Sequence, residues 1–354
     1  MLHLTSCTSQ NKSLAQQPIS EEKTAQPKNI ILLIADGTGL SQISALQFYS
    51  EAPVNYDRFP VVGLIKTSSS SELVTDSAAG ATAFASGIKT FNGAVGVAQD
   101  STAVITIAEE VSKIGWDTGL IATSSITHAT PACFYAHVPD RDLELDIALQ
   151  LVNSDIDFFA GGGLEFFRGR WDGLDLVDAL GFNGFKMNTS KLESSEETKQ
   201  GFLLAQDGMP KMLEGRGDFL PKATQMALDQ LSKNKKGFFL MVEGSQVDWG
   251  GHDNDADYLI TEIIDFDKAL GVAMDFAEKD GETLVIVTAD HETGGFTLAA
   301  SESGYETITP TFSTDSHSAT MVPVFSYGPG SETFGGIYEN TEIYHKMKKL
   351  IFPK

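Results

Sequence analysis

The segment Glu243–His252 contains three side chains of the types that bind metal ions. Asp248 and His252 lie four residues apart, so one helical turn would place them side by side, facing a single ion. Glu243 directly follows an apolar run and adds a second carboxylate. Taken alone, the Asp248 and His252 pair also fits a solvated helix face. The segment indicates a metal site only together with donors elsewhere in the chain.

Further donors follow downstream. Asp290 and His291 offer an oxygen and a nitrogen in adjacent positions, and His317 supplies another imidazole in polar surroundings. An adjacent Asp-His pair also occurs at turns and caps. Mixed histidine and carboxylate ligands are typical of zinc, whereas oxygen donors alone favour magnesium.

A nucleophile candidate lies in the segment Val74–Ala85, which is rich in small residues. Asp76 can cap a helix formed by the residues that follow it. Ser77 would then lie in the first turn, where free backbone N–H groups and the helix dipole favour an anion. The simpler interpretation of this segment alone is a plain capped helix that packs tightly.

Short apolar runs lead into these side chains, and helical patterns separate the runs. Such runs are typical of strands buried on both faces. The runs occupy residues 30–35, 118–123, 237–242 and 283–289, and the helical patterns 103–114, 222–233 and 258–278. The alternation predicts an α/β fold, a three-layer α/β/α sandwich with a large, mostly parallel central sheet. Ligands bind outside the carboxyl ends of such strands, which here carry Asp36, Glu243, Asp290 and His291.

Charge and composition exclude several functional classes. The 354 residues include 25 Lys and Arg against 48 Asp and Glu, a net charge of −23. This balance argues against a nucleic-acid reader, which would need a basic surface. No apolar run approaches the roughly 18 residues that span a bilayer. The acidic and imidazole groups expected at one sheet edge would repel each other without a counter-charge, which itself suggests bound metal.

The chain is expected to contain one catalytic domain, residues 29–354, with a less regular lobe at about 164–217. Residues 1–28 are polar and aperiodic, and we interpret them as a flexible tail or the remnant of a signal. Leu4–Cys7 resembles the end of a bacterial lipoprotein signal, although the charged and apolar regions that should precede it are missing. We therefore expect bacterial-type export to the periplasm or the exterior, with a possible lipid anchor at Cys7. The alternative is that the match to a signal arises by chance.

The motifs together resemble the alkaline phosphatase family. The match to its nucleophile motif is Asp76–Ala83, and the other matches occur in order between residue 29 and about 330. They are Asp36–Gly39, Thr127–Ala132, Ala136–Arg141, Glu243–His252, Thr288–Gly295 and His317. As a set these motifs are highly specific.

The resemblance implies two zinc ions and one magnesium ion. The first zinc would be held by Asp248, His252 and His317, and the second by Asp36, Asp290, His291 and the Ser77 oxygen. The magnesium would be held by Asp36, Thr130 and Glu243, with His128 beside it. His128 stands where some bacterial relatives have aspartate, and Trp249 where some have lysine. These departures should change magnesium and phosphate affinity more than the type of reaction.

The family's phosphate clamp aligns with Arg141, one of only five arginines in the chain. A surface ion pair with Asp140 or Asp142 is the alternative for this side chain. The implied activity is hydrolysis of small phosphate monoesters to an alcohol and inorganic phosphate, through a phosphoserine at Ser77. The implied assembly is a homodimer.

Two other classes of function remain as alternatives. A phosphodiesterase or sulfatase of the same superfamily is one, although the sulfatase nucleophile motif is not found in the sequence. A non-catalytic zinc-binding protein is the other, and the presence of both Ser77 and Arg141 disfavours it.

Overall fold

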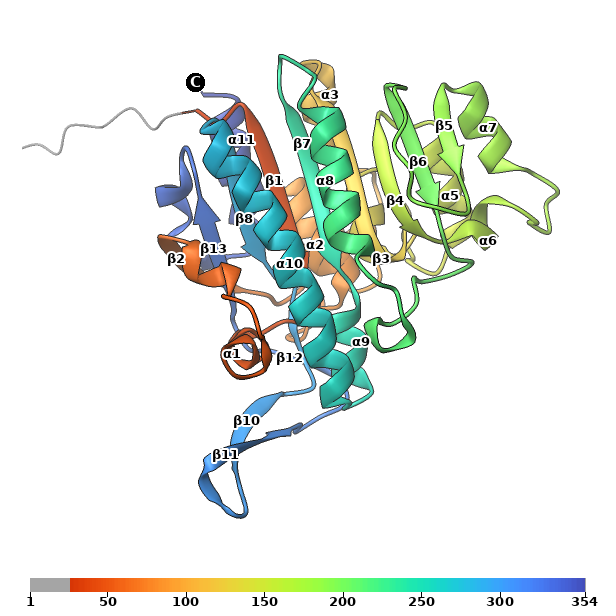
Figure 1. Cartoon of the computed structure of the whole chain (residues 1–354). Coiled ribbons are helices and arrows are strands. Elements are labelled where there is room, and N and C mark those ends of the chain that lie inside the picture. The colour runs from red at the N-terminus through yellow and green to blue at the C-terminus, as the bar shows by residue number, and fades with distance from the viewer. Residues whose placement is uncertain (1–25, 354) are drawn as a thin grey trace, which may run out of the picture.

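A ten-stranded sheet forms the middle layer of the computed structural model, which describes residues 26–353 (Figure 1). The strand order is β14-β2-β13-β8-β1-β7-β3-β4-β6-β5. All neighbours are parallel except that β13 runs antiparallel to β2 and β8. In chain order the strands are β1 (Asn29–Ala35), β2 (Val61–Lys66), β3 (Asp117–Ser125), β4 (Phe158–Gly162), β5 (Phe185–Asn188), β6 (Lys199–Leu203), β7 (Phe238–Gly244), β8 (Thr283–Thr288), β13 (Val322–Tyr327) and β14 (Gly336–Glu339).

Helices cover both faces of the sheet, which confirms the predicted three-layer α/β/α sandwich with a mostly parallel sheet. One face packs against α2 (Ser77–Ser86), α3 (Ile107–Lys113), α4 (Ala129–Ala132), α5 (Glu144–Val152), α6 (Leu164–Phe167), α7 (Leu176–Phe182) and α11 (Glu342–Ile351). The other packs against α1 (Leu40–Tyr49), α8 (Phe219–Leu231), α9 (Gln246–His252) and α10 (Ala256–Asp280). Residues 26–353 also contain three short 3-10 helices, η1 (Asn55–Arg58), η2 (Met212–Glu214) and η3 (Ser331–Phe334).

The central strand β1 shows why the sheet requires two helical layers. Its side chains alternate between the two apolar cores, and every residue from Ile30 to Ile34 is fully buried. Ile30 and Leu32 pack on the α2 side, whereas Ile31 and Leu33 pack on the α10 side. A strand that is apolar on both faces is stable only when both faces are covered.

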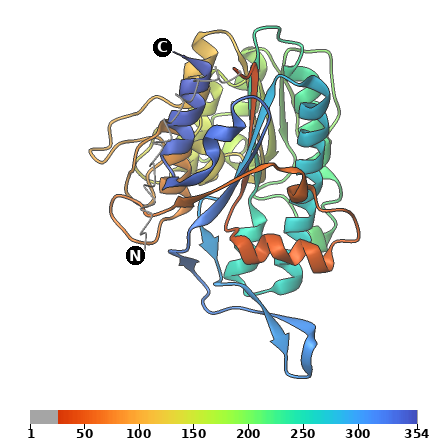
Figure 2. The same cartoon turned by 90° about the vertical axis from the view of Figure 1, so that its left-hand side faces the viewer.

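Two features depart from the regular sandwich. Residues 164–217, expected as a less regular lobe, contain α6, α7, β5, β6 and η2, and β5 and β6 extend the central sheet beside β4. A hairpin of β10 (Thr297–Ser301) and β11 (Gly304–Thr311) projects from the body in both views (Figure 2).

Within residues 26–353, no helix is long and apolar enough to cross a bilayer. Cys7, the possible lipid-anchor residue, and residues 1–25 of the predicted tail lie outside the described part of the chain. The other cysteine, Cys133, is a buried free thiol.

The strand register brings the candidate donors to one edge. Ile34 of β1 pairs with Glu243 of β7 on one side and with Thr288 of β8 on the other. Asp36 lies two residues beyond Ile34 and Asp290 two residues beyond Thr288. The carboxyl ends of three adjacent parallel strands therefore present their acidic side chains together.

Candidate active site

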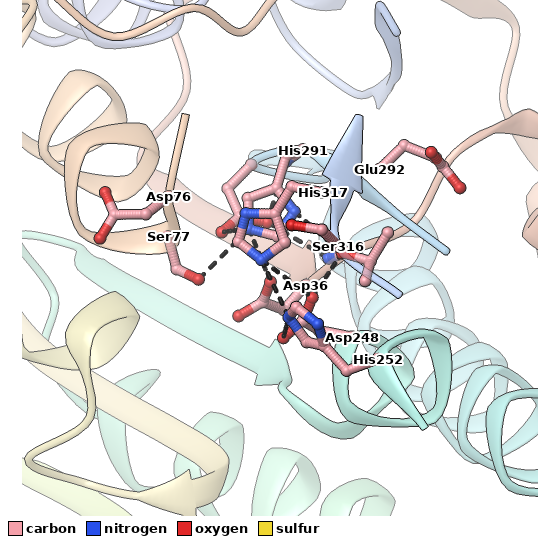
Figure 3. Close-up of polar contacts among 12 residues, drawn as sticks. Asp36, Asp76, Ser77, Asp248, His252, His291, Glu292, Ser316 and His317 are labelled. Carbon is pink, nitrogen blue, oxygen red and sulfur yellow. Dashed lines mark hydrogen bonds and ion pairs between the residues drawn. The ribbon is translucent and has the colours of Figure 1, made fainter. Parts of the chain in front are cut away.

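The first donor cluster consists of Asp248, His252 and His317 (Figure 3). The one-turn spacing within α9 brings His252 Nε2 to 3.5 Å from an Asp248 carboxylate oxygen. His317 Nε2 lies 3.5 Å from the other oxygen of Asp248 and 3.1 Å from His252 Nε2. Three donor atoms at these distances could hold one cation.

Backbone carbonyls orient both imidazoles of this cluster. His252 Nδ1 lies 2.7 Å from the carbonyl oxygen of Asp315, and His317 Nδ1 lies 2.9 Å from that of Thr75. A carbonyl can only accept, so each Nδ1 carries the proton and each Nε2 presents its lone pair to the cluster. This arrangement is typical of histidines that bind metal. The pairing of β12 (His317–Ser318) with β9 (Glu292–Thr293) holds His317 in place.

The second cluster is centred on His291 Nε2. This atom lies 3.5 Å from an Asp36 oxygen, 3.3 Å from an Asp290 oxygen and 3.3 Å from Ser77 Oγ. Asp36, Asp290 and His291 are fully buried, and Ser77 is 2% exposed. Burial, with the neighbouring His317 as a second cause, lowers the pKa of His291 to about 3. The imidazole is therefore neutral and able to act as a ligand.

Ser77 is the first residue of α2, as the capping pattern predicted. The Asp76 side chain accepts a hydrogen bond from the Ala79 N–H at 2.9 Å and so caps the helix. Gly80, in the first turn, packs against Asp290, and a Cβ there would lie 2.9 Å from that residue's Cβ. Glycine at this position thus lets the helix N-terminus approach the second cluster closely.

The third cluster contains Asp36, His128 and Glu243, which offer donor atoms within 4.8 Å of one another. The sequence placed His128 beside a magnesium site, and the structure brings it into the donor group itself. Thr130 is also buried, and its hydroxyl has no hydrogen-bond partner. The same holds for both oxygens of Asp36, for Glu243 Oε1 and for His128 Nδ1. Buried polar atoms without partners are costly, and a bound cation would offset that cost for the oxygen atoms.

The electrostatics of the clusters also favour bound cations. Burial and then repulsion from Asp290, Asp248 and Glu243 raise the pKa of Asp36 well above its usual value. Burial raises the pKa of Glu243 to about 8, and burial also raises the pKa of Asp290. Bound divalent cations would supply the missing partners and favour the charged carboxylates. The donor types fit such ions: histidine and carboxylate in the first two clusters, and mainly oxygen in the third.

Arg141 contacts two residues of the site, Asp76 and His128. Its Nη1 donates to Asp76 Oδ2 at 3.1 Å, and its Nη2 lies 3.2 Å from His128 Nε2. The ion pair is thus with the residue that caps α2, and not with Asp140 or Asp142. Burial lowers the pKa of Arg141, but the charges of Asp76 and of more distant carboxylates raise it by more. The pKa of Arg141 is therefore above its usual value. The guanidinium therefore stays charged beside Ser77.

Two contacts within the site were not predicted from the sequence. Thr293 Oγ1 donates to Asp248 and lies 3.2 Å from His291 Nδ1, so it links the first two clusters. The Trp249 ring lies 6.0 Å from the His128 ring, centroid to centroid. Nothing in the residue types near Thr293 marks this role, because the contact depends on the turn after β8.

Comparison with known proteins agrees with this geometry. A family model described as alkaline phosphatase matches residues 27–311. Alkaline phosphatase 3 of Bacillus subtilis is 33% identical, with 92% of this chain and 89% of that protein covered. The alkaline phosphatase of Escherichia coli is 32% identical, with 92% and 86% covered.

Among solved structures, the alkaline phosphatase of the Antarctic bacterium TAB5 has a TM-score of 0.91 and 57% sequence identity, covering 93% of this chain and 99% of that one. Two variants of that protein, each with one histidine replaced by aspartate or glutamate, hold magnesium at a metal site.

Proposed function

This chain belongs to the alkaline phosphatase family and is a phosphoric monoester hydrolase, and from that premise we propose that Ser77 is its nucleophile. Ser77 attacks the phosphorus of a phosphate monoester, the alcohol leaves, and water then hydrolyses the phosphoserine to inorganic phosphate. The observation that carries the proposal is the position of Ser77 Oγ, 3.3 Å from His291 Nε2 and beside unpartnered carboxylates.

We assign zinc to the first two clusters and magnesium to the third. The residues that would hold zinc are Asp248, His252 and His317 in the first site, and Asp36, Asp290, His291 and Ser77 in the second. Asp36, Thr130 and Glu243 would hold magnesium, with His128 beside the site. When bound, such cations lower the pKa of hydroxyl groups and water and stabilise a leaving oxygen.

The chain's own groups bind and orient the phosphate. The N-terminus of α2 directs backbone N–H groups and a positive dipole end toward the Ser77 side chain, which favours an anion there. Arg141 uses one donor for Asp76 and one for His128, so its other N–H groups are available to two non-bridging phosphate oxygens. Asp76 holds the helix and Arg141 together and so fixes the nucleophile relative to the clamp.

The alternative reactions are less well supported. A phosphodiesterase or sulfatase is disfavoured because the relatives described above are named alkaline phosphatases. A non-catalytic zinc-binding protein would not need Ser77 and Arg141 beside the clusters.

Replacement of the nucleophile tests the proposal. Ser77→Ala should lower turnover of a phosphate monoester by at least about a thousandfold, because no other group supplies the attacking oxygen. Fold and zinc content should stay close to those of the parent. Assays of the parent with a monoester, a diester and a sulfate ester give the substrate class. Acid quench of the parent with labelled monoester then identifies the residue that carries the phosphate. Label on a residue other than Ser77, or preference for the diester or sulfate, would refute the assignment.

Export and assembly complete the proposal. The family resemblance supports a periplasmic or extracellular location and a homodimer. Light scattering of the purified protein measures its mass in solution, and cell fractionation gives its location.

A further inference from the structure

A pocket of about 320 Å³ adjoins the first donor cluster and is lined by Lys211, Trp249, His252, Asp253 and Tyr258. His252 belongs both to this pocket and to the cluster that would bind the first zinc ion. The pocket therefore opens beside the reaction centre. Its volume is at the lower end of the range for small-molecule sites, about 300–1,000 Å³.

The Trp249 side chain connects the pocket to the other side of the site. Its ring packs edge-on against His128, which in turn contacts Arg141. The backbone of Gly208 supports the indole: a Cβ at that position would lie 2.7 Å from the ring. Because the pocket and the first donor cluster share His252, an alcohol part that extends from the phosphate past that cluster would lie close to the indole.

The loop that carries Gly208 is itself fixed. The next residue, Met209, donates its N–H to the Thr123 carbonyl at 3.0 Å and accepts from Gln246 Nε2 at 2.6 Å. Farther along, the buried Arg216 side chain pairs with two carboxylates of α10. The indole is therefore held in place before any substrate arrives, which reduces the entropy lost on binding.

The polar groups of the pocket are already paired with one another. Lys211 Nζ lies 3.9 Å from the centroid of the Tyr258 ring and 3.2 Å from an Asp253 oxygen. The Tyr258 hydroxyl donates to Gln246 Oε1 at 2.9 Å. The remaining feature that a ligand could use is aromatic surface without a net charge. Such a surface suits a flat, uncharged ring better than a second anionic group.

We propose that this pocket is a subsite for the alcohol part of the substrate, a proposal that rests on the phosphomonoesterase function given above. It selects monoesters whose alcohol carries a planar ring system, of which nucleoside 5′-phosphates are the natural class, by stacking that ring on Trp249. A base stacked on an aromatic side chain typically changes affinity by about five- to a hundredfold. Because the pocket is open on one side, we expect a change of about tenfold.

Two substrates with the same leaving oxygen isolate the contribution of the ring. Adenosine 5′-phosphate and ribose 5-phosphate both release a primary ribose hydroxyl, and only the former carries a base. The measured quantity is the ratio of their kcat/KM values in the zinc- and magnesium-loaded enzyme. The ratio should exceed one in the parent, fall about tenfold in Trp249→Ala and stay within about twofold in Trp249→Phe. Trp171→Ala is the matched control, because Trp171 is 88% exposed in the loop between α6 and α7. This variant should leave the ratio unchanged.

Gly208→Ala provides a second variant that leaves the indole itself intact. The added methyl group would displace the ring, so the ratio should fall in the same direction as in Trp249→Ala. Inhibition by adenosine, the alcohol product, gives a reading that does not depend on the chemical step. Its inhibition constant should rise about tenfold in Trp249→Ala.

Equal ratios in the parent and in Trp249→Ala, or an unchanged adenosine inhibition constant, would overturn the proposal. Equal losses on both substrates would also overturn it, since they would show that Trp249 supports the metal or phosphate site instead. A folded, metal-loaded parent that hydrolyses neither ester would contradict the proposed function, a result distinct from a failure of the subsite alone.

Discussion

Two clusters of buried carboxylates in this molecule differ in how their charge is balanced. On α10, Glu262 and Asp265 are 2% and 1% exposed, and both pair with the buried guanidinium of Arg216. At the strand ends, Asp36, Glu243 and Asp290 are buried to the same degree, but Arg141 pairs instead with Asp76. The chain supplies the counter-charge in the α10 cluster and omits it in the strand-end cluster.

The pKa values of the two clusters show the consequence. Burial raises the pKa of Glu262 and of Asp265, and the charge of Arg216 opposes the rise in both. For Asp36, repulsion from the other carboxylates adds to burial and no cation of the chain opposes it among the main causes. The α10 cluster is therefore a structural ion-pair network, whereas the strand-end cluster is suited to cations from solution.

Replacement of Arg216, the cation of the α10 cluster, should have the largest effect on stability. Arg216→Met leaves two buried carboxylates without their cation, so the free energy of unfolding should fall by about 3–5 kcal/mol. Chemical denaturation of the metal-loaded protein measures it. Zinc content and the turnover of the folded fraction on a small alkyl phosphate should stay near parental values. A loss of bound zinc larger than the loss of folded protein would show that the two clusters are coupled and would break the comparison.

The stability of the metal-free protein should fall as pH rises from about 5 to 8. The folded chain keeps a proton on Glu243 up to a pKa of about 8, whereas the unfolded chain releases it near 4.5. The folded state thus binds more protons in this window, and each such proton contributes a slope of about 1.4 kcal/mol per pH unit. Thermal unfolding after exhaustive chelation, repeated with zinc and magnesium restored, measures the slope. A slope that is the same with and without metal would show that cations do not neutralise this cluster.

The sequence predicted the layers, and the structure brings the candidate donors together at the strand ends. Continuous apolar runs such as 30–35 are typical of strands covered on both sides, and the donors directly follow them. The spacing of Asp248 and His252 is local, so one helical turn determines their contact. Residue types and spacing therefore predicted the edge of the sheet at which the clusters form.

Contacts between distant loops could not be predicted in this way. Asp76 and Arg141 are 65 residues apart, and no pattern along the chain indicates that the helix cap would also hold the guanidinium. The same applies to the entry of His128 into the third cluster and to Gly208 behind Trp249. These positions follow from how loops pack over the strand ends, which local periodicity does not encode.

The smallest expected effect concerns Arg141, which lies beside the strand-end cluster. Arg141→Lys keeps the charge but loses the planar fork, so about 1.5–3 kcal/mol of charged hydrogen bonding to phosphate should disappear. This corresponds to about a tenfold or greater loss in kcat/KM and a similar rise in the inhibition constant of inorganic phosphate. Equal phosphate inhibition constants in the parent and the variant would show that Arg141 is not the clamp.

The most direct test of the central claim is the metal content of the chain, measured together with its turnover. Elemental analysis of the purified enzyme, dialysed against zinc and magnesium, should give about two zinc ions and one magnesium ion per chain. Turnover of a phosphate monoester should disappear as chelation removes them and return when both metals are restored. Full turnover in a preparation with less than about one divalent cation per chain would contradict the account.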